Sequence, residues 1–207
     1  MECNTILAVT SKMTAMLFLH PRKTWDYVGK VRIQLPYNCG IDDCDKGFII
    51  AMDLVEKIRN KKHHLNTLET EYTTLFVSSY PNIKCPPYES YYTEPDAFLA
   101  KEQVVKDINA ILNSLGLEVD KKQEKMPDHI ITELELLGIL LAMPPESGAN
   151  TLLEALIRKH LLVWLLKFSS CIKTHATQEY YKKLAQILEC MHGCFVRLYG
   201  APLILPK

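Results

Sequence analysis

A short acidic segment in the second half of the chain holds the densest group of side chains that could do chemistry. Pro127 is followed directly by Asp128 and His129. Glu133 and Glu135 come within the next two helical turns. A histidine beside a carboxylate is suited to acid–base chemistry, and His129 and Glu133, four residues apart on a helix, can touch. The segment therefore predicts polar groups beside a hydrophobic stripe, with Asp128 and His129 as a candidate acid–base pair.

The element expected to position these groups is a helix from Pro127 to about Met143. Pro127 suits a first helical turn because it lacks an amide proton and its φ is already near the helical value. Asp128 near that end would also be favoured by the helix dipole, which is a purely structural alternative for this residue. Four apolar residues at helical spacing predict a buried face: Ile130, Leu134, Leu137 and Leu141.

Helical spacing recurs along almost the whole chain, which predicts an all-α protein with a single domain over residues 1–207. Helices are expected over residues 5–19, 21–31, 48–60, 65–76, 96–115, 127–143, 150–168 and 178–198. Residues 38–47 have the composition of a loop, residues 31–35 alternate like a short strand, and residues 117–126 form a charged connector. Gly116 is expected to end a helix, whereas Asn150 and Thr177 are expected to cap the starts of two.

Charge and apolar content exclude several classes of function. The chain has 24 basic and 24 acidic residues, so it lacks the net positive charge of a typical nucleic-acid-binding protein. The apolar stretch over residues 6–19 lacks a basic leader and is interrupted by Ser11-Lys12, and residues 161–166 are far shorter than the roughly 20 needed to span a bilayer. No stable membrane insertion is expected.

Seven irregularly spaced cysteines suit free thiols in a reducing compartment, so a cytoplasmic protein is expected. Cys190, His192 and Cys194 cannot bind one metal ion on a regular helix, because His192 points away from the other two. Cys39 and Cys44 are also expected to be free. The chain has no phosphate-binding glycine loop, no Gly-x-Ser-x-Gly and no His-Glu-x-x-His, so neither a cofactor, a metal nor an enzymatic activity is predicted.

Three motifs together resemble the TorD, DmsD and NarJ family of redox-enzyme maturation chaperones. Residues 71–76 (Glu-Tyr-Thr-Thr-Leu-Phe) are similar to the family's Tyr-x-x-Leu-Phe helix, and residues 86–90 (Pro-Pro-Tyr-Glu-Ser) to its Pro-Pro-Tyr-Glu-Ser loop. The third motif is Pro-Asp-His-Ile at 127–130 with Glu-Leu-Glu at 133–135. A weaker block comprises His160, Trp164 and Tyr180-Tyr181, and Leu136 departs from the family's usual aromatic residue. The resemblance spans roughly residues 60–190.

The resemblance implies a TorD-like helical bundle in the cytoplasm that binds the twin-arginine leader, and the body, of a molybdopterin-dependent oxidoreductase. The resemblance is compatible with either a monomer or a homodimer. Carboxylates would pair with the arginines and apolar side chains would line a groove for the rest of the leader. The implied peptide-binding residues are Tyr72, Leu75, Phe76, Pro87, Tyr88, Glu124, Asp128, His129, Glu133 and Glu135.

Three alternatives remain open from the residues alone. Tyr72, Leu75 and Phe76 could simply belong to the hydrophobic core. The protein could be a helical adaptor without specificity for a leader. It could also be a small-molecule enzyme that uses Asp128 and His129, although adjacent residues on a helix do not face each other.

Overall fold

A computed structural model describes residues 2–28, 30, 38–60, 64–79, 82–93, 97–119 and 126–202. Regular structure in these ranges is helical, as the spacing of apolar residues predicts. The α-helices are α1 (Glu2–Leu17), α2 (Pro21–Val28), α3 (Asp42–Arg59), α4 (Leu65–Tyr72), α5 (Ser90–Thr93), α6 (Ala97–Ser114), α7 (Ile130–Ala142), α8 (Ala149–Ala155), α9 (Leu162–His175) and α10 (Glu179–Tyr199). Two π-helical turns, η1 (Thr73–Val77) and η4 (Leu156–Leu161), and a 3₁₀ turn, η3 (Pro145–Ser147), complete the order.

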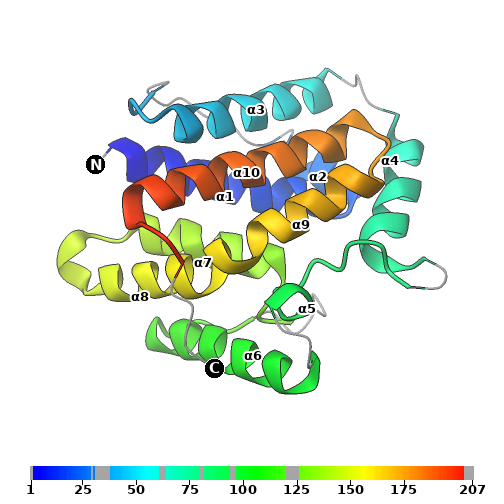
Figure 1. The fold of residues 1–207 in the computed structure, drawn as a ribbon. Coiled ribbons are helices and arrows are strands. Elements are labelled where there is room, and N and C mark those ends of the chain that lie inside the picture. The colour runs from blue at the N-terminus through cyan, green and yellow to red at the C-terminus, as the bar shows by residue number, and fades with distance from the viewer. Residues whose placement is uncertain are drawn as a thin grey trace.

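The helices stack in layers around α1, which packs against α7 on one side and α3 on the other (Figure 1). α10 lies between α3 and α9, and α6 forms the opposite edge of the bundle. The close approach of α1 to α7 depends on Gly138. A Cβ atom there would lie 2.8 Å from Lys12 Cγ and 3.3 Å from the carbonyl oxygen of Ala8. The glycine therefore lets the Lys12 stem lie directly across α7.

An aromatic cluster joins α9 to the rest of the core. The ring of Phe168 lies 5.2 Å from Trp164, 5.7 Å from Phe18 and 6.1 Å from Phe76. The α9 face expected to be buried is buried, and so is the expected face of α10 except for the exposed Leu198. Tyr181 places its hydroxyl 2.7 Å from the Leu68 carbonyl oxygen, so this buried polar group is satisfied.

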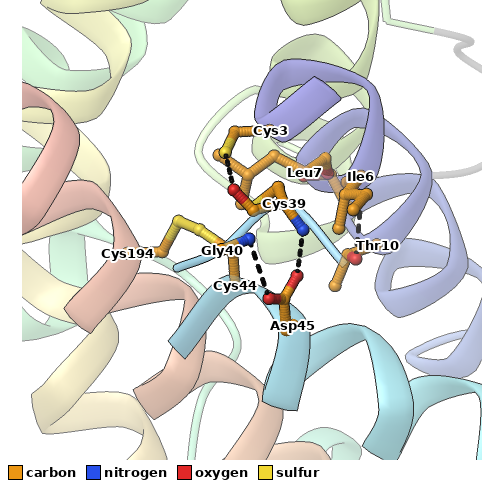
Figure 2. The surroundings of a disulfide bond; sticks show 10 residues. Cys3, Ile6, Leu7, Thr10, Cys39, Gly40, Cys44, Asp45 and Cys194 are labelled. Carbon is orange, nitrogen blue, oxygen red and sulfur yellow. Dashed lines mark hydrogen bonds between the residues drawn. A yellow bond between two sulfur atoms is a disulfide. The ribbon is translucent and has the colours of Figure 1, made fainter. Parts of the chain in front are cut away.

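The start of α3 differs from the sequence prediction, which assigned residues 38–47 to a loop. α3 begins at Asp42. The three aspartates that suggested a loop lie in the first helical turn, where the helix dipole favours negative charge. Asp45 also accepts hydrogen bonds from the backbone amides of Cys39, at 2.7 Å, and Gly40, at 3.2 Å (Figure 2).

Three other predicted helix starts were wrong, and at two of them another residue performs the capping. α7 begins at Ile130 instead of Pro127, and His129 is its N-cap. α8 begins at Ala149, so Asn150 lies inside it. At the start of α10, the Glu71 carboxylate accepts from the Gln178 amide at 2.9 Å and also from the Thr177 amide. A cap supplied from 107 residues away has no local sequence signal.

Gly116 ends α6 as expected, with a positive φ of 68° and a 2.9 Å hydrogen bond from the Leu117 amide to the Leu112 carbonyl. The expected strand over residues 31–35, the core of the charged connector and its Glu124 lie outside the described residues. None of the helices in the described part of the chain is long and apolar enough to cross a membrane.

The prediction of free thiols was wrong for four cysteines. Cys44 in α3 is bonded to Cys194 in α10, with Cα atoms 5.3 Å apart (Figure 2). Cys85 is bonded to Cys171 in α9, with Cα atoms 5.8 Å apart. These pairs are 150 and 86 residues apart in sequence, so only the fold brings them together. Cys3, Cys39 and Cys190 remain as free thiols.

Candidate functional site

The second and third sequence motifs meet through backbone hydrogen bonds, although about 40 residues separate them. Tyr88 and His129 form an isolated antiparallel bridge. The Ile130 amide donates to the Pro87 carbonyl at 2.9 Å, and the Glu89 amide donates to the Asp128 carbonyl at 2.9 Å. The segment before α5 is thereby fixed against the start of α7.

Asp128 lies inside this junction and does not cap α7. Its side chain is 0% exposed. Its Oδ2 atom accepts a 2.6 Å hydrogen bond from the Ser90 hydroxyl and a longer one, at 3.3 Å, from the Ser90 amide. Its Oδ1 atom is buried and has no hydrogen-bond partner among the described residues. A buried acceptor without a donor is costly, so this oxygen is suited to an incoming hydrogen-bond donor.

The rings of Tyr88 and His129 form the outer part of the junction. They meet edge to face with centroids 5.1 Å apart. His129 Nδ1 accepts from the Ile131 amide at 3.1 Å, which places the ring proton of the neutral imidazole on Nε2. Burial, followed by the charge of Asp128, raises the pKa of the half-buried Tyr88. The aspartate and the two rings therefore act on one another within a single site.

Tyr72 connects the first motif to this site. Burial and the nearby Tyr88 raise the pKa of Tyr72 to about 12. Its ring packs 5.5 Å from Phe76 and 5.3 Å from His20. Residues of all three sequence motifs consequently lie around Tyr88.

Behind the site is a group of buried polar side chains, of which the sequence analysis assigned only Glu133 as functional. Glu89 and His160 Nδ1 form a 2.9 Å hydrogen bond, and both side chains are almost fully buried. Glu133, which is 0% exposed, accepts from the Trp164 indole N–H at 3.0 Å. The only sequence signal for the three new residues, Glu89, His160 and Trp164, was their presence in the family-like blocks.

Burial shifts both glutamates toward the protonated form. Desolvation is the main reason that the pKa of Glu133 lies well above its ordinary value, and the neighbouring Glu89 and Asp128 charges raise it further. Desolvation also raises the pKa of Glu89, while its hydrogen bond and charge interaction with His160 oppose the shift. The two carboxyl groups are therefore coupled parts of one buried network.

The free energy of unfolding should fall as pH rises above about 4.5, because Glu133 binds its proton more tightly in the folded state than in the unfolded state. The stabilisation that Glu133 contributes is fully present below its pKa in the unfolded state. It is lost as the pH rises to its higher pKa in the folded state. Glu133→Gln should flatten this decline while keeping an acceptor for Trp164. Glu102→Gln, a control at an exposed glutamate, should leave the pH dependence of the free energy of unfolding unchanged. Urea unfolding between pH 5 and 8 measures both slopes, and equal slopes for wild type and Glu133→Gln would contradict the assignment.

The other predicted site residues within the described ranges add no polar side chain to this cluster. Leu75 and Phe76 are buried in the core, as the structural alternative proposed, and Pro87 is buried within the junction, where its carbonyl oxygen accepts from the Ile130 amide. Glu135 is exposed and lines a separate cavity of about 730 Å³ between α1, α2 and α7. No group of three or more potential ligands in the described ranges is arranged to hold a metal ion.

This chain belongs to the nitrate reductase delta subunit family, whose model matches residues 49–170. The match contains all three motifs and confirms the resemblance to the TorD, DmsD and NarJ group of redox-enzyme maturation proteins. Among similar proteins, the "Chaperone protein TorD" of Vibrio parahaemolyticus is 22% identical over 66% of this chain and 66% of its own length. The "Chaperone protein TorD" of Photobacterium profundum is 23% identical over 69% of this chain and 73% of its own length.

A solved structure has the same fold. The crystal structure of a putative redox enzyme maturation protein from Archaeoglobus fulgidus superposes with a TM-score of 0.56, covering 87% of this chain and 90% of that one. The two sequences are 24% identical. The expected TorD-like helical bundle is therefore confirmed.

Proposed function

We propose that this protein is a cytoplasmic maturation chaperone that binds the twin-arginine leader of a molybdopterin-dependent oxidoreductase before export. The main support is the backbone pairing of the Pro87–Ser90 segment with the Asp128–Ile130 segment, which brings two of the family-like motifs together. Membership in a family of maturation chaperones supports the same assignment. The role is one of binding and holding rather than of catalysis.

The buried Asp128 Oδ1 atom is the proposed acceptor for a leader arginine. A guanidinium group has planar N–H donors and matches a carboxylate better than an ammonium group does. It would enter beside the half-buried Tyr88, whose ring also offers a face for cation–π contact. Entry would give a donor to an oxygen that has none in the described structure. The apolar part of the leader would then extend over the surface next to Tyr72 and Tyr88.

The other expected residues have narrower proposed roles. His129 holds the Tyr88 ring and caps α7, whereas Glu133 and Glu89 support the site from behind. Glu135 and Glu124 are proposed to contact the leader or the body of the oxidoreductase outside this locus. A helical adaptor without leader specificity would show no preference for the arginines, so the same experiments separate the two functions.

Tyr88→Ala should weaken the binding of a cognate leader peptide about tenfold, since truncating one central aromatic contact commonly costs 1 kcal/mol or more. The fold should be retained because Tyr88 is only half-buried. Calorimetric titration with the leader measures the affinity, and circular dichroism checks the fold. Val196→Ala is the control, because Val196 is a 42% exposed residue of α10 and belongs neither to the Tyr88 junction nor to the lining of the Glu135 cavity. Unchanged affinity in Tyr88→Ala, or an equal loss in Val196→Ala, would contradict the Tyr88 site.

A further inference from the structure

The two disulfides differ in how easily a thiol could reach them. Both sulfur-bearing residues of the Cys44–Cys194 pair are buried, at 2% and 0% exposure. In the other pair Cys85 is 0% exposed, but Cys171 in α9 is only partly buried. Thiol–disulfide exchange requires a thiolate to reach one sulfur atom directly. Cys171 is therefore the accessible point of attack.

The accessible disulfide fastens the segment that carries Tyr88. Cys85 lies three residues before Tyr88, and its amide donates to the Leu75 carbonyl at 2.8 Å. The bond to Cys171 ties this segment covalently to α9, while the Pro87 and Glu89 backbone contacts tie it to the start of α7. By contrast, Cys44–Cys194 joins α3 to α10 (Figure 2) and ties down no residue of the Tyr88 segment.

We propose that Cys85–Cys171 is a redox-exchangeable latch that holds the Tyr88 segment in its binding conformation, so that cellular dithiols lower leader affinity by opening it. This inference rests on the proposed leader-binding function. Disulfides that occur in the reducing cytoplasm are usually transient or redox-sensing, which fits an accessible bond beside a binding site. The buried Cys44–Cys194 bond is the structural one of the two.

The exchange is balanced for a dithiol reductant. A thiolate of the reductant attacks Cys171 Sγ, the Cys85–Cys171 bond breaks, and Cys85 leaves as a thiolate that takes up a proton. The second thiol of the reductant then attacks the mixed disulfide and releases Cys171 as a thiol. The protein disulfide gains two electrons and two protons, and the reductant becomes a cyclic disulfide.

Opening the latch removes the covalent tie between this segment and α9. The segment then keeps the Cys85–Leu75 hydrogen bond, the backbone and Ser90 hydrogen bonds to the start of α7, and the Glu89–His160 pair. A cross-link limits the open conformations available to such a segment, so its loss favours local opening. Tyr88 would then spend less time against His129, and leader affinity would fall by the fraction of molecules that are open.

The test is stepwise reduction of the full chain with dithiothreitol, followed by alkylation and mass spectrometry. Cys85 and Cys171 should become alkylated about ten times faster than Cys44 and Cys194. Amide hydrogen exchange over residues 82–93 should then accelerate about tenfold, with α10 unchanged. Cys171→Ser should reproduce the acceleration without reductant, whereas Cys3→Ser, which removes a free thiol elsewhere, should not.

Leader affinity completes the test. It should fall about tenfold in the selectively reduced protein and in Cys171→Ser, and remain unchanged in Cys3→Ser. Equal reduction rates for the two disulfides, or unchanged exchange over residues 82–93, would overturn the latch. Faster exchange with unchanged leader affinity would overturn its link to binding. If no leader binds in any redox state, the proposed function fails, and the alkylation and exchange rates alone decide whether the latch exists.

Discussion

Trp164→Ala is expected to lower the free energy of unfolding by about 3–5 kcal/mol, the usual cost of removing a fully buried large aromatic side chain. Trp164 is 0% exposed, and its ring lies 5.2 Å from Phe168 and stacks 5.7 Å from Tyr92. The substitution would leave a cavity at the centre of the aromatic cluster. It would also remove the indole donor from Glu133, adding the cost of an unpaired buried group.

Two further variants separate these contributions. Trp164→Phe restores most of the ring packing but not the donor, so its loss of stability should be clearly smaller than that of Trp164→Ala. Leu166→Ala, two residues along α9, removes a side chain that is 45% exposed and should change stability by no more than about 0.5 kcal/mol. Urea denaturation at constant pH measures all three. A loss below about 1 kcal/mol for Trp164→Ala would contradict the central packing role of this residue.

The helical architecture could be predicted because apolar residues recur at helical spacing along the sequence. Trp164 and Phe168 were expected to share the buried face of one helix, and both are buried. Boundaries were less predictable, since several depend on side-chain contacts, some of them with distant groups, that helical spacing does not show. The start of α10 is stabilised by Glu71, and the start of α3 by an aspartate that turns back to the amides of residues 39 and 40.

The candidate site was predictable as a set of motifs but not as a geometry. Sequence spacing gave no indication that Asp128 would be buried beneath Tyr88, because that position follows from long-range backbone pairing. The partner of Glu89 is His160, 71 residues away, and it is presented by a π-helical turn that no periodic pattern predicts. Glu135 shares a motif with Glu133 but faces another cavity, since residues two apart on a helix point in different directions.

The cysteines show the same limitation. An odd number with irregular spacing favoured free thiols, and for Cys3, Cys39 and Cys190 the structure agrees. The four paired residues come from segments that are adjacent only in the folded chain. Neither disulfide could therefore be predicted from the local sequence.

Replacing the two arginines of a cognate leader by lysines is expected to weaken its binding about a hundredfold. A lysine ammonium group cannot reproduce the planar donor geometry of a guanidinium, so each replacement should cost about 1.4 kcal/mol, or a factor of ten. The effect should be larger than that of Tyr88→Ala, because the planar donor geometry is lost at two positions of the leader. Part of the affinity should also fall with added salt, as expected for interactions between charges.

The most direct test of the leader-binding proposal is calorimetric titration of the oxidised protein with twin-arginine leaders from its own organism, each paired with its twin-lysine version. One leader should bind with an affinity that drops about a hundredfold in the lysine version and about tenfold in the Tyr88→Ala protein. Equal affinity for the arginine and lysine versions of every leader, or no binding of any leader, would contradict the proposal that this maturation chaperone recognises a twin-arginine signal.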